Sequence, residues 1–252
     1  MKNKMNNLED YTNSWENDEV QVEILFSAAG VGTTIALLSK FTGKMMLLDV
    51  GDGAIRDLLV LQNNHEFVNE IDLIAISHGH FDHVGGLYSL LGFMRMLKRT
   101  KPLNIIIPPN CKEVIELVRV YKDLHCDTLP FKIWHHEISP GSDFDTDFFK
   151  VKSFEVEHYS FENISEEDAE VLEPAHGYRI QIGGTTIAYT GDTRMCSGAE
   201  MLVKDADLAI IEATHPKKPD SKRRVHLTID EAKNLGALAK EYLLIHMIPE
   251  VK

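Results

Sequence analysis

Cysteine is scarce in this sequence. Its three cysteines, Cys111, Cys126 and Cys196, are widely spaced, and no CxxC pair occurs. An odd, scattered set of thiols argues against a disulfide framework and indicates reduced cysteines in a cytoplasmic protein. The N-terminal residues also lack the apolar stretch of a secretion signal, and no apolar run approaches the ~20 residues of a membrane span. A cytoplasmic protein without a membrane span is therefore expected.

Basic residues are also few in comparison with acidic residues. Lysine and arginine total 26 against 39 acidic residues, which gives a net charge of −13. Binding to the backbone of an extended nucleic acid needs a basic face, so such a partner is disfavoured. A small phosphate-bearing substrate that is held through metal ions stays compatible with this charge.

The order of apolar segments predicts a layered α/β domain. Residues 1–19 are polar and are expected to form a disordered or loosely attached leader, followed by a single domain over 20–252. Strand-like runs such as "VQVEILFS" and "IDLIAIS" alternate with amphipathic segments such as "AIRDLLVLQNN" and "CKEVIELVRVYKDL". Hairpins are predicted at Thr42-Gly43 and Gly183-Gly184, and a helix is predicted to start at Thr228. Two sheets with helices packed outside them suit this order.

The segment "SHGHFDHVGGL" carries the clearest chemical signal. It places His78, His80, Asp82 and His83 within six residues, directly after an apolar strand-like run. Imidazole nitrogens and carboxylate oxygens both suit a metal ion such as Zn²⁺. The alternative is a cluster of histidines satisfied by hydrogen bonds, which the complete HxHxDH pattern disfavours. We therefore interpret this segment as half of a metal site.

"SHGHFDHVGGL" resembles the signature of the metallo-β-lactamase superfamily, and "LLDVGDG" resembles that superfamily's other early motif. The resemblance implies an αββα four-layer sandwich with two divalent metal ions, Zn²⁺ foremost and Mn²⁺ or Fe as alternatives, and hydrolysis by a metal-bridging hydroxide. It also implies three further ligands, a His, an Asp and a His. "IAYTGDT" matches the aspartate at Asp192, for which a turn cap is the alternative, and "YLLIHMIP" matches the last histidine at His246.

Two histidines compete for the middle ligand. His158 ends an alternating strand and precedes a loop, whereas His176 begins the next strand, "HGYRI". The superfamily pattern favours His158 and leaves His176 as a pocket residue. One metal is then expected on His78, His80 and His158, the other on Asp82, His83 and His246, with Asp192 between them.

The resemblance also implies roles for the carboxylates of Asp82 and Asp49. Asp82 is expected to orient the hydroxide as well as bind metal. Asp49 is expected to accept a hydrogen bond from a ligand histidine, with a simple turn residue as the alternative.

Two later segments indicate which bond the predicted hydrolase cleaves. "IIEATH" and "VHLTIDEA" resemble paired motifs of the ribonuclease Z branch of the superfamily. The resemblance implies that Glu212 orients His226, and that His226 acts as a general acid or charge stabiliser at the phosphate. The alternative is a surface carboxylate and an ordinary residue at the entry of a helix.

The same comparison argues against tRNA as the substrate. The long glycine-rich arm with which ribonuclease Z grips tRNA has no room in this sequence between the middle histidine and Asp192. A separate feature is the acidic insertion at 160–175, between His158 and His176, which is expected to form a lip over the site.

We therefore predict a dinuclear metal-dependent phosphodiesterase that acts on a small or cyclic phosphodiester or a short nucleic acid. The rival is a carboxylic ester, lactone or thioester hydrolase. A tRNA 3′-processing endonuclease and a non-catalytic metal-binding protein are less favoured. Relatives in the superfamily are often dimeric, so a homodimer is compatible with the resemblance.

Overall fold

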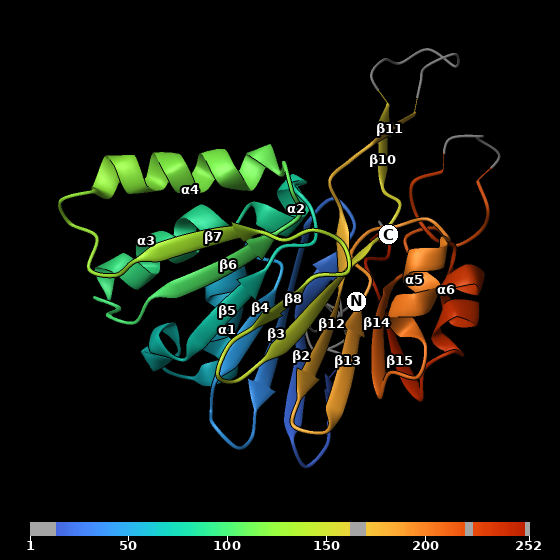
Figure 1. Cartoon of the computed structure of the whole chain (residues 1–252), viewed down its shortest axis with the longest axis horizontal. Helices are drawn as coiled ribbons and strands as arrows, with labels where there is room; N and C mark the ends of the chain where they lie inside the picture. The colour runs from blue at the N-terminus through green and yellow to red at the C-terminus, as the bar shows by residue number, and fades with distance from the viewer. Residues whose placement is uncertain (1–13, 162–169, 220–223, 250–252) are drawn as a thin grey trace, which may run out of the picture.

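Two β-sheets face each other in the computed structural model, and helices cover the outer face of each (Figure 1). The structure describes residues 14–161, 170–219 and 224–249. The layers follow the order helix, sheet, sheet, helix. The predicted αββα sandwich is therefore confirmed.

The first sheet has seven strands in the order β1 to β7. Strands β2, β3 and β4 pair antiparallel, and β4 to β7 pair parallel. The strands are β1 (Ser14–Glu16), β2 (Val20–Ala28), β3 (Gly32–Ser39), β4 (Met45–Leu48), β5 (Ile71–Ala75), β6 (Leu103–Ile107) and β7 (Ile133–Glu137). The connecting helices are α1 (Ala54–Gln62), a 3-10 helix (Glu66–Asn69), α2 (Phe81–Val84), α3 (Leu87–Met96) and α4 (Lys112–His125).

The second sheet has six strands in the order β15-β14-β13-β12-β9-β8. Strands β13, β14 and β15 run parallel, whereas β8, β9, β12 and β13 pair antiparallel. Its strands are β8 (Asp143–Asp145), β9 (Lys150–Glu155), β12 (His176–Ile182), β13 (Thr185–Tyr189), β14 (Leu208–Glu212) and β15 (Glu241–Ile245). The helices are α5 (Ser197–Val203) and α6 (Ile229–Gly236), and β10 (Tyr159–Phe161) pairs with β11 (Glu170–Leu172) in a separate ribbon.

Three apolar layers hold the sandwich together. The middle layer lies between the sheets and includes Leu48, Leu73, Tyr178 and Ile187, all fully buried. The outer layers pack α1, α3 and α4 against the first sheet and α5 and α6 against the second. Central strands are covered on both faces, which explains why "MMLL" in β4 is apolar without alternation.

Most predicted elements are present. The turns at Thr42-Gly43 and Gly183-Gly184 join antiparallel strands. Thr228 caps α6 in a capping box with Glu231, as its position before the helix predicted.

The predicted leader and the acidic insertion lie partly outside the described residues. The described chain starts with β1, so pairing begins before Val20, where the sequence placed the start of the domain. The insertion is described only at its two ends, in β10 and β11. No helix among the described residues has the length and hydropathy needed to cross a membrane.

A buried arginine stabilises the end of the first sheet at which β5 and β6 begin. The Arg99 side chain is fully buried. Its Nε donates to Lys101 O at 2.8 Å, and its Nη2 donates to Ile71 O at 2.7 Å and Pro102 O at 2.8 Å. A fourth carbonyl, Val68 O, accepts from Nη1. The guanidinium thus satisfies carbonyls around the start of β5 and carbonyls just before β6.

Replacing Arg99 by Met should lower the free energy of unfolding by about 3 kcal/mol, because buried carbonyls lose charged donors. The urea midpoint at constant m-value measures this loss. Arg56→Met, at an exposed side chain, is the control and should change the midpoint little. Equal midpoints for the two variants would contradict the assigned role.

Candidate metal centre

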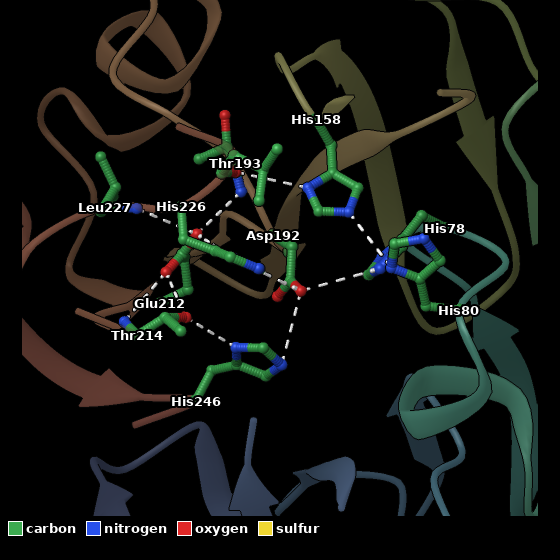
Figure 2. A network of polar contacts seen from close by, with 12 residues as sticks. His78, His80, His158, Asp192, Thr193, Glu212, Thr214, His226, Leu227 and His246 are labelled. Carbon is green, nitrogen blue, oxygen red and sulfur yellow. Dashed lines mark hydrogen bonds and ion pairs between the residues drawn. The ribbon is translucent and has the colours of Figure 1, made fainter. Parts of the chain in front are cut away.

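Polar side chains gather where strands of both sheets end. In the first sheet, Asp49 follows β4, and residues 77–83 follow β5. In the second sheet, β9, β13 and β15 are followed by His158, Asp192 and His246, and β14 ends on Glu212. These strands point the same way within their sheets, so their carboxyl ends meet at one edge, where open α/β folds commonly build sites. Figure 2 shows the resulting convergence.

Three histidines form the first cluster. The ligand atoms of His78, His80 and His158 all lie within 4.8 Å of one another. His158 Nε2 lies 3.2 Å from His80 Nδ1. His78 and His158 are buried, whereas His80 is exposed, so the cluster opens to solvent on one side. A site with two buried ligands and one exposed ligand remains accessible to a substrate.

Asp82, His83 and His246 form the second cluster. His246 Nε2 lies 3.2 Å from both His83 Nε2 and Asp82 Oδ2. Ligand atoms on one tetrahedral zinc, with bonds near 2.0 Å, are about 3.3 Å apart. The observed spacing therefore suits a shared cation.

Asp192 lies between the two clusters. Its Oδ2 is 3.4 Å from His246 Nε2 and 3.7 Å from His78 Nε2 (Figure 2). The same oxygen is 3.4 Å from His83 Nε2. The carboxylate thus contacts a member of each cluster from a single buried position. This is the placement expected of a ligand shared by two cations.

Hydrogen bonds behind three of the histidines fix their ring orientation. His83 Nδ1 lies 2.7 Å from Asp49 Oδ2, as the sequence predicted for Asp49. His246 Nδ1 lies 2.9 Å from Thr214 Oγ1, and His78 Nδ1 lies 3.0 Å from Ser77 Oγ. In each ring, Nε2 is left facing the centre. Outer partners of this kind set the tautomer of metal-binding histidines.

The electrostatics of the clusters suit a cation. Burial, together with the nearby His83, holds the pKa of His78 well below its ordinary value, so His78 is neutral. Burial opposes protonation of His83, but the carboxylates of Asp192 and Asp49 outweigh it and hold its pKa well above the usual range. Burial would raise the pKa of Asp82, yet His246 and His83 lower it to about 2. Positive charge is therefore favoured between the clusters.

An unpartnered atom gives a direct test of fit. His78 Nε2 is buried and makes no hydrogen bond within the part of the chain that the structure describes. Buried polar atoms are rarely left unsatisfied. A lone pair aimed at the space between two His/Asp clusters is satisfied by a metal ion, so the donor set fits divalent cations.

Glu212 and His226 form a pair beside the clusters. His226 Nδ1 lies 3.0 Å from Glu212 Oε1 and 3.8 Å from Asp192 Oδ2. Burial would lower the pKa of His226, but the hydrogen bond and charge of Glu212, with the charge of Asp192, raise it to about 9. Glu212 is fully buried and also accepts from Thr193 N and Leu227 N. The pair is therefore a fixed, protonatable group at the edge of the site.

The structure brings all of the predicted site residues together and separates His176 from them. No ligand cluster among the described residues contains His176, whereas His158 belongs to two.

Sequence reasoning missed Ser77, Tyr189 and Thr214. Tyr189 donates to Asp49 Oδ2 at 2.5 Å, and Thr214 Oγ1 donates to Glu212 Oε2 at 2.8 Å. The only sequence feature that marks these three residues is a hydroxyl group at, or just after, the end of an apolar strand.

Comparison with known proteins identifies the family. The profile described as the beta-lactamase superfamily domain matches residues 46–247. The chain belongs to the beta-lactamase superfamily. Ribonuclease Z of Saccharolobus islandicus is 29% identical over 90% of this chain and 89% of its own length. Ribonuclease Z of Metallosphaera sedula is 30% identical over 84% and 81%.

A solved structure shares the fold of this superfamily member. Human tRNase Z, short form, superposes with a TM-score of 0.68 at 23% identity, covering 90% of this chain and 92% of its own. The family, its ribonuclease Z relatives and the His/Asp clusters identify this superfamily member as a metal-dependent hydrolase.

Substituting His158 and His176 separately distinguishes ligand from neighbour. His158→Ala should lower the metal content by about one ion per chain, because it removes a nitrogen of the first cluster. His176→Ala should keep the wild-type content. Elemental analysis of the purified proteins measures both, and a metal loss confined to His176→Ala would reverse the assignment.

Proposed function

We propose that this protein is a dinuclear metal phosphodiesterase acting on a small or cyclic phosphodiester or a short nucleic acid. The observation that carries the proposal is the Glu212–His226 pair, with His226 Nδ1 3.0 Å from the buried carboxylate and 3.8 Å from Asp192. An alkoxide leaving a phosphate benefits from a proton donor, which this pair can supply. Ribonuclease Z relatives, named for an RNA-cleaving activity, support the same reaction class.

The cation ligands in this proposal are five histidines and two aspartates. One cation would be held by His78, His80 and His158, the other by Asp82, His83 and His246, and Asp192 would bind both. Two such cations supply Lewis acidity at the phosphoryl oxygens and lower the pKa of bound water. The excess of nitrogen ligands favours Zn²⁺, with Mn²⁺ and Fe as alternatives.

Asp82 has a second role in the proposal, which is to orient the attacking water. Its Oδ2 is held by Gly30 N–H at 2.8 Å and lies 3.2 Å from His246 Nε2. The backbone hydrogen bond from Gly30 limits the rotation of this carboxylate. It can therefore accept a proton from water along a fixed direction.

His226 protonates the leaving oxygen in this scheme. Glu212 accepts from two backbone N–H groups and from Thr214, so it cannot turn away from His226. The Nδ1–H of His226 stays on Glu212, and Nε2 is the nitrogen left to carry a proton to the substrate. The hydrogen bond and the charge of the Glu212 carboxylate favour the protonated form of His226 by raising its pKa.

Charge favours a short substrate. The chain has a net charge of −13, and the sequence at 160–175 contains six acidic residues and no basic residue. A long RNA would be repelled by this concentration of negative charge in the sequence after His158. The homodimer and the cytoplasmic location remain predictions, the latter supported by three free cysteines.

A substrate panel tests the reaction class. The metal-loaded protein should hydrolyse bis(p-nitrophenyl) phosphate and 2′,3′-cyclic nucleotides, and should turn over lactones and thioesters at least a hundredfold more slowly. Initial rates at matched concentrations measure this, with apo protein as the control. Acyl turnover without phosphodiester turnover would overturn the proposal. Efficient cleavage of a precursor tRNA would overturn the preference for short substrates.

The leaving group tests His226. His226→Ala should lower kcat/KM about 10²- to 10⁴-fold on a cyclic nucleotide, whose alkoxide needs a proton. It should lower kcat/KM much less on bis(p-nitrophenyl) phosphate, whose phenolate leaves unaided. His65→Ala, at an exposed and remote histidine, is the control. Equal losses on the two esters, with metal content unchanged, would contradict proton donation by His226.

A further inference from the structure

Tyr189 connects the two sheets beside the candidate metal centre. It is the last residue of β13 and is fully buried. Its hydroxyl donates to Asp49 Oδ2 at 2.5 Å, and Asp49 follows β4 of the first sheet. Burial and the charge of Asp49 hold the pKa of Tyr189 well above its ordinary value, so the hydroxyl keeps its proton. The phenol is therefore a lasting hydrogen-bond donor across the interface between the sheets.

The oxygen that Tyr189 contacts is the one that holds a ligand histidine. Asp49 Oδ2 lies 2.7 Å from His83 Nδ1 and also accepts from Ser77 Oγ at 2.7 Å. Ser77 and His83 both belong to the segment after β5, so Tyr189 adds a donor from the opposite sheet. Removing one of the three donors leaves the carboxylate freer to rotate, and a ring that is hydrogen-bonded to it loses orientation as well.

The strand that ends on Tyr189 leads directly to Asp192. Gly191 lies between them with a φ of 57°, and a Cβ at this glycine would lie 2.7 Å from Ser77 Cβ. The turn after β13 therefore passes directly against the first sheet. Asp192 Oδ2 then lies 3.4 Å from His83 Nε2. Tyr189 thus stands at the start of the segment that places Asp192 opposite His83.

A second tyrosine crosses the same interface but ends on the backbone. Tyr178 of β12 is fully buried, and its hydroxyl donates to Ile76 O of the first sheet at 2.7 Å. The sheets are also joined by the hydrogen bond from His176 N–H to Ser77 O and by the apolar layer between them. The fold should therefore survive the loss of either tyrosine hydroxyl.

We propose that Tyr189 is a positioning residue for the second cation, the one expected on Asp82, His83 and His246. The inference rests on the cation ligands of the proposed function and not on its substrate. The hydroxyl fixes the Asp49 carboxylate, the carboxylate fixes the His83 ring, and the ring presents Nε2 to the cation. Outer partners of ligand histidines typically contribute a factor of roughly 10 to 100 in metal affinity. A contact one step further out belongs at the lower end of that range.

Tyr189→Phe and Tyr178→Phe are the matched variants. Titration of the apo proteins with Zn²⁺ in competition with a chromophoric chelator measures the affinities for both ions. Tyr189→Phe should weaken one of the two affinities about tenfold, whereas Tyr178→Phe should leave both unchanged. The two variants should lower the urea midpoint by similar amounts, because each loses one buried hydrogen bond.

A combined variant assigns the affected ion. His158→Ala is expected to lose the first cation, so the single ion that it keeps reports on the second cluster. Adding Tyr189→Phe to His158→Ala should weaken that remaining ion by the same factor of about ten. An unchanged affinity for the remaining ion would contradict the assignment of Tyr189 to the second cation.

A double-mutant cycle tests whether Tyr189 acts through Asp49. In an Asp49→Asn background, Tyr189→Phe should cause no further loss of Zn²⁺ affinity, because the carboxylate that it positions is gone. Equal affinity losses in Tyr189→Phe and Tyr178→Phe, or a loss in neither, would overturn this inference while leaving the phosphodiesterase proposal standing. A wild-type protein that binds no Zn²⁺ would overturn the proposed ligands together with this inference.

Discussion

The buried carboxylate of Asp49 joins the two sheets and the metal centre. It stands after β4 with a φ of 57°, a left-handed conformation that turns the chain sharply at the strand end. Its oxygens accept from Ser77 N and Ser77 Oγ of the first sheet and from Tyr189 of the second. The same carboxylate contacts His83 Nδ1. An uncompensated carboxylate at this depth would be costly, so these four contacts are required together.

Glu212 has the corresponding role in the second sheet. It ends β14 fully buried and accepts from the backbone of Thr193 and Leu227, the residues beside Asp192 and His226. Through Thr214 Oγ1 it is also connected to His246 Nδ1. Asp49 therefore positions ligands that come from the first sheet, and Glu212 positions groups that come from the second. Because Tyr189 reaches Asp49 across the interface, the two sets keep a fixed relation.

Part of this centre could be predicted from the sequence, because four potential ligand side chains lie within six residues after one strand. They are His78, His80, Asp82 and His83. Asp192 and His246, each following an apolar strand, were recognisable through their resemblance to superfamily motifs. Ser77, Tyr189 and Thr214 could not be found, because one hydroxyl in a strand has no spacing that separates it from an ordinary surface residue. Short elements such as β1, α2 and α5 were missed for a related reason, since their stability comes from tertiary packing rather than from local pattern.

The choice between His158 and His176 shows that a local sequence pattern cannot by itself distinguish a candidate ligand from another buried histidine. Both histidines adjoin strands that pair with each other, since His176 lies opposite Glu155 in the register of β12 and β9. His158 lies beyond the end of β9 and turns toward His80, whereas His176 is the first residue of β12 and is buried apart from the ligand clusters. Three residues along the chain, from Glu155 to His158, thus separate the candidate ligand from the position opposite His176. Asp49 and Glu212 hold the candidate ligands and His226 through contacts that do not include His176, so the sequence position of a histidine beside a strand does not by itself decide its role.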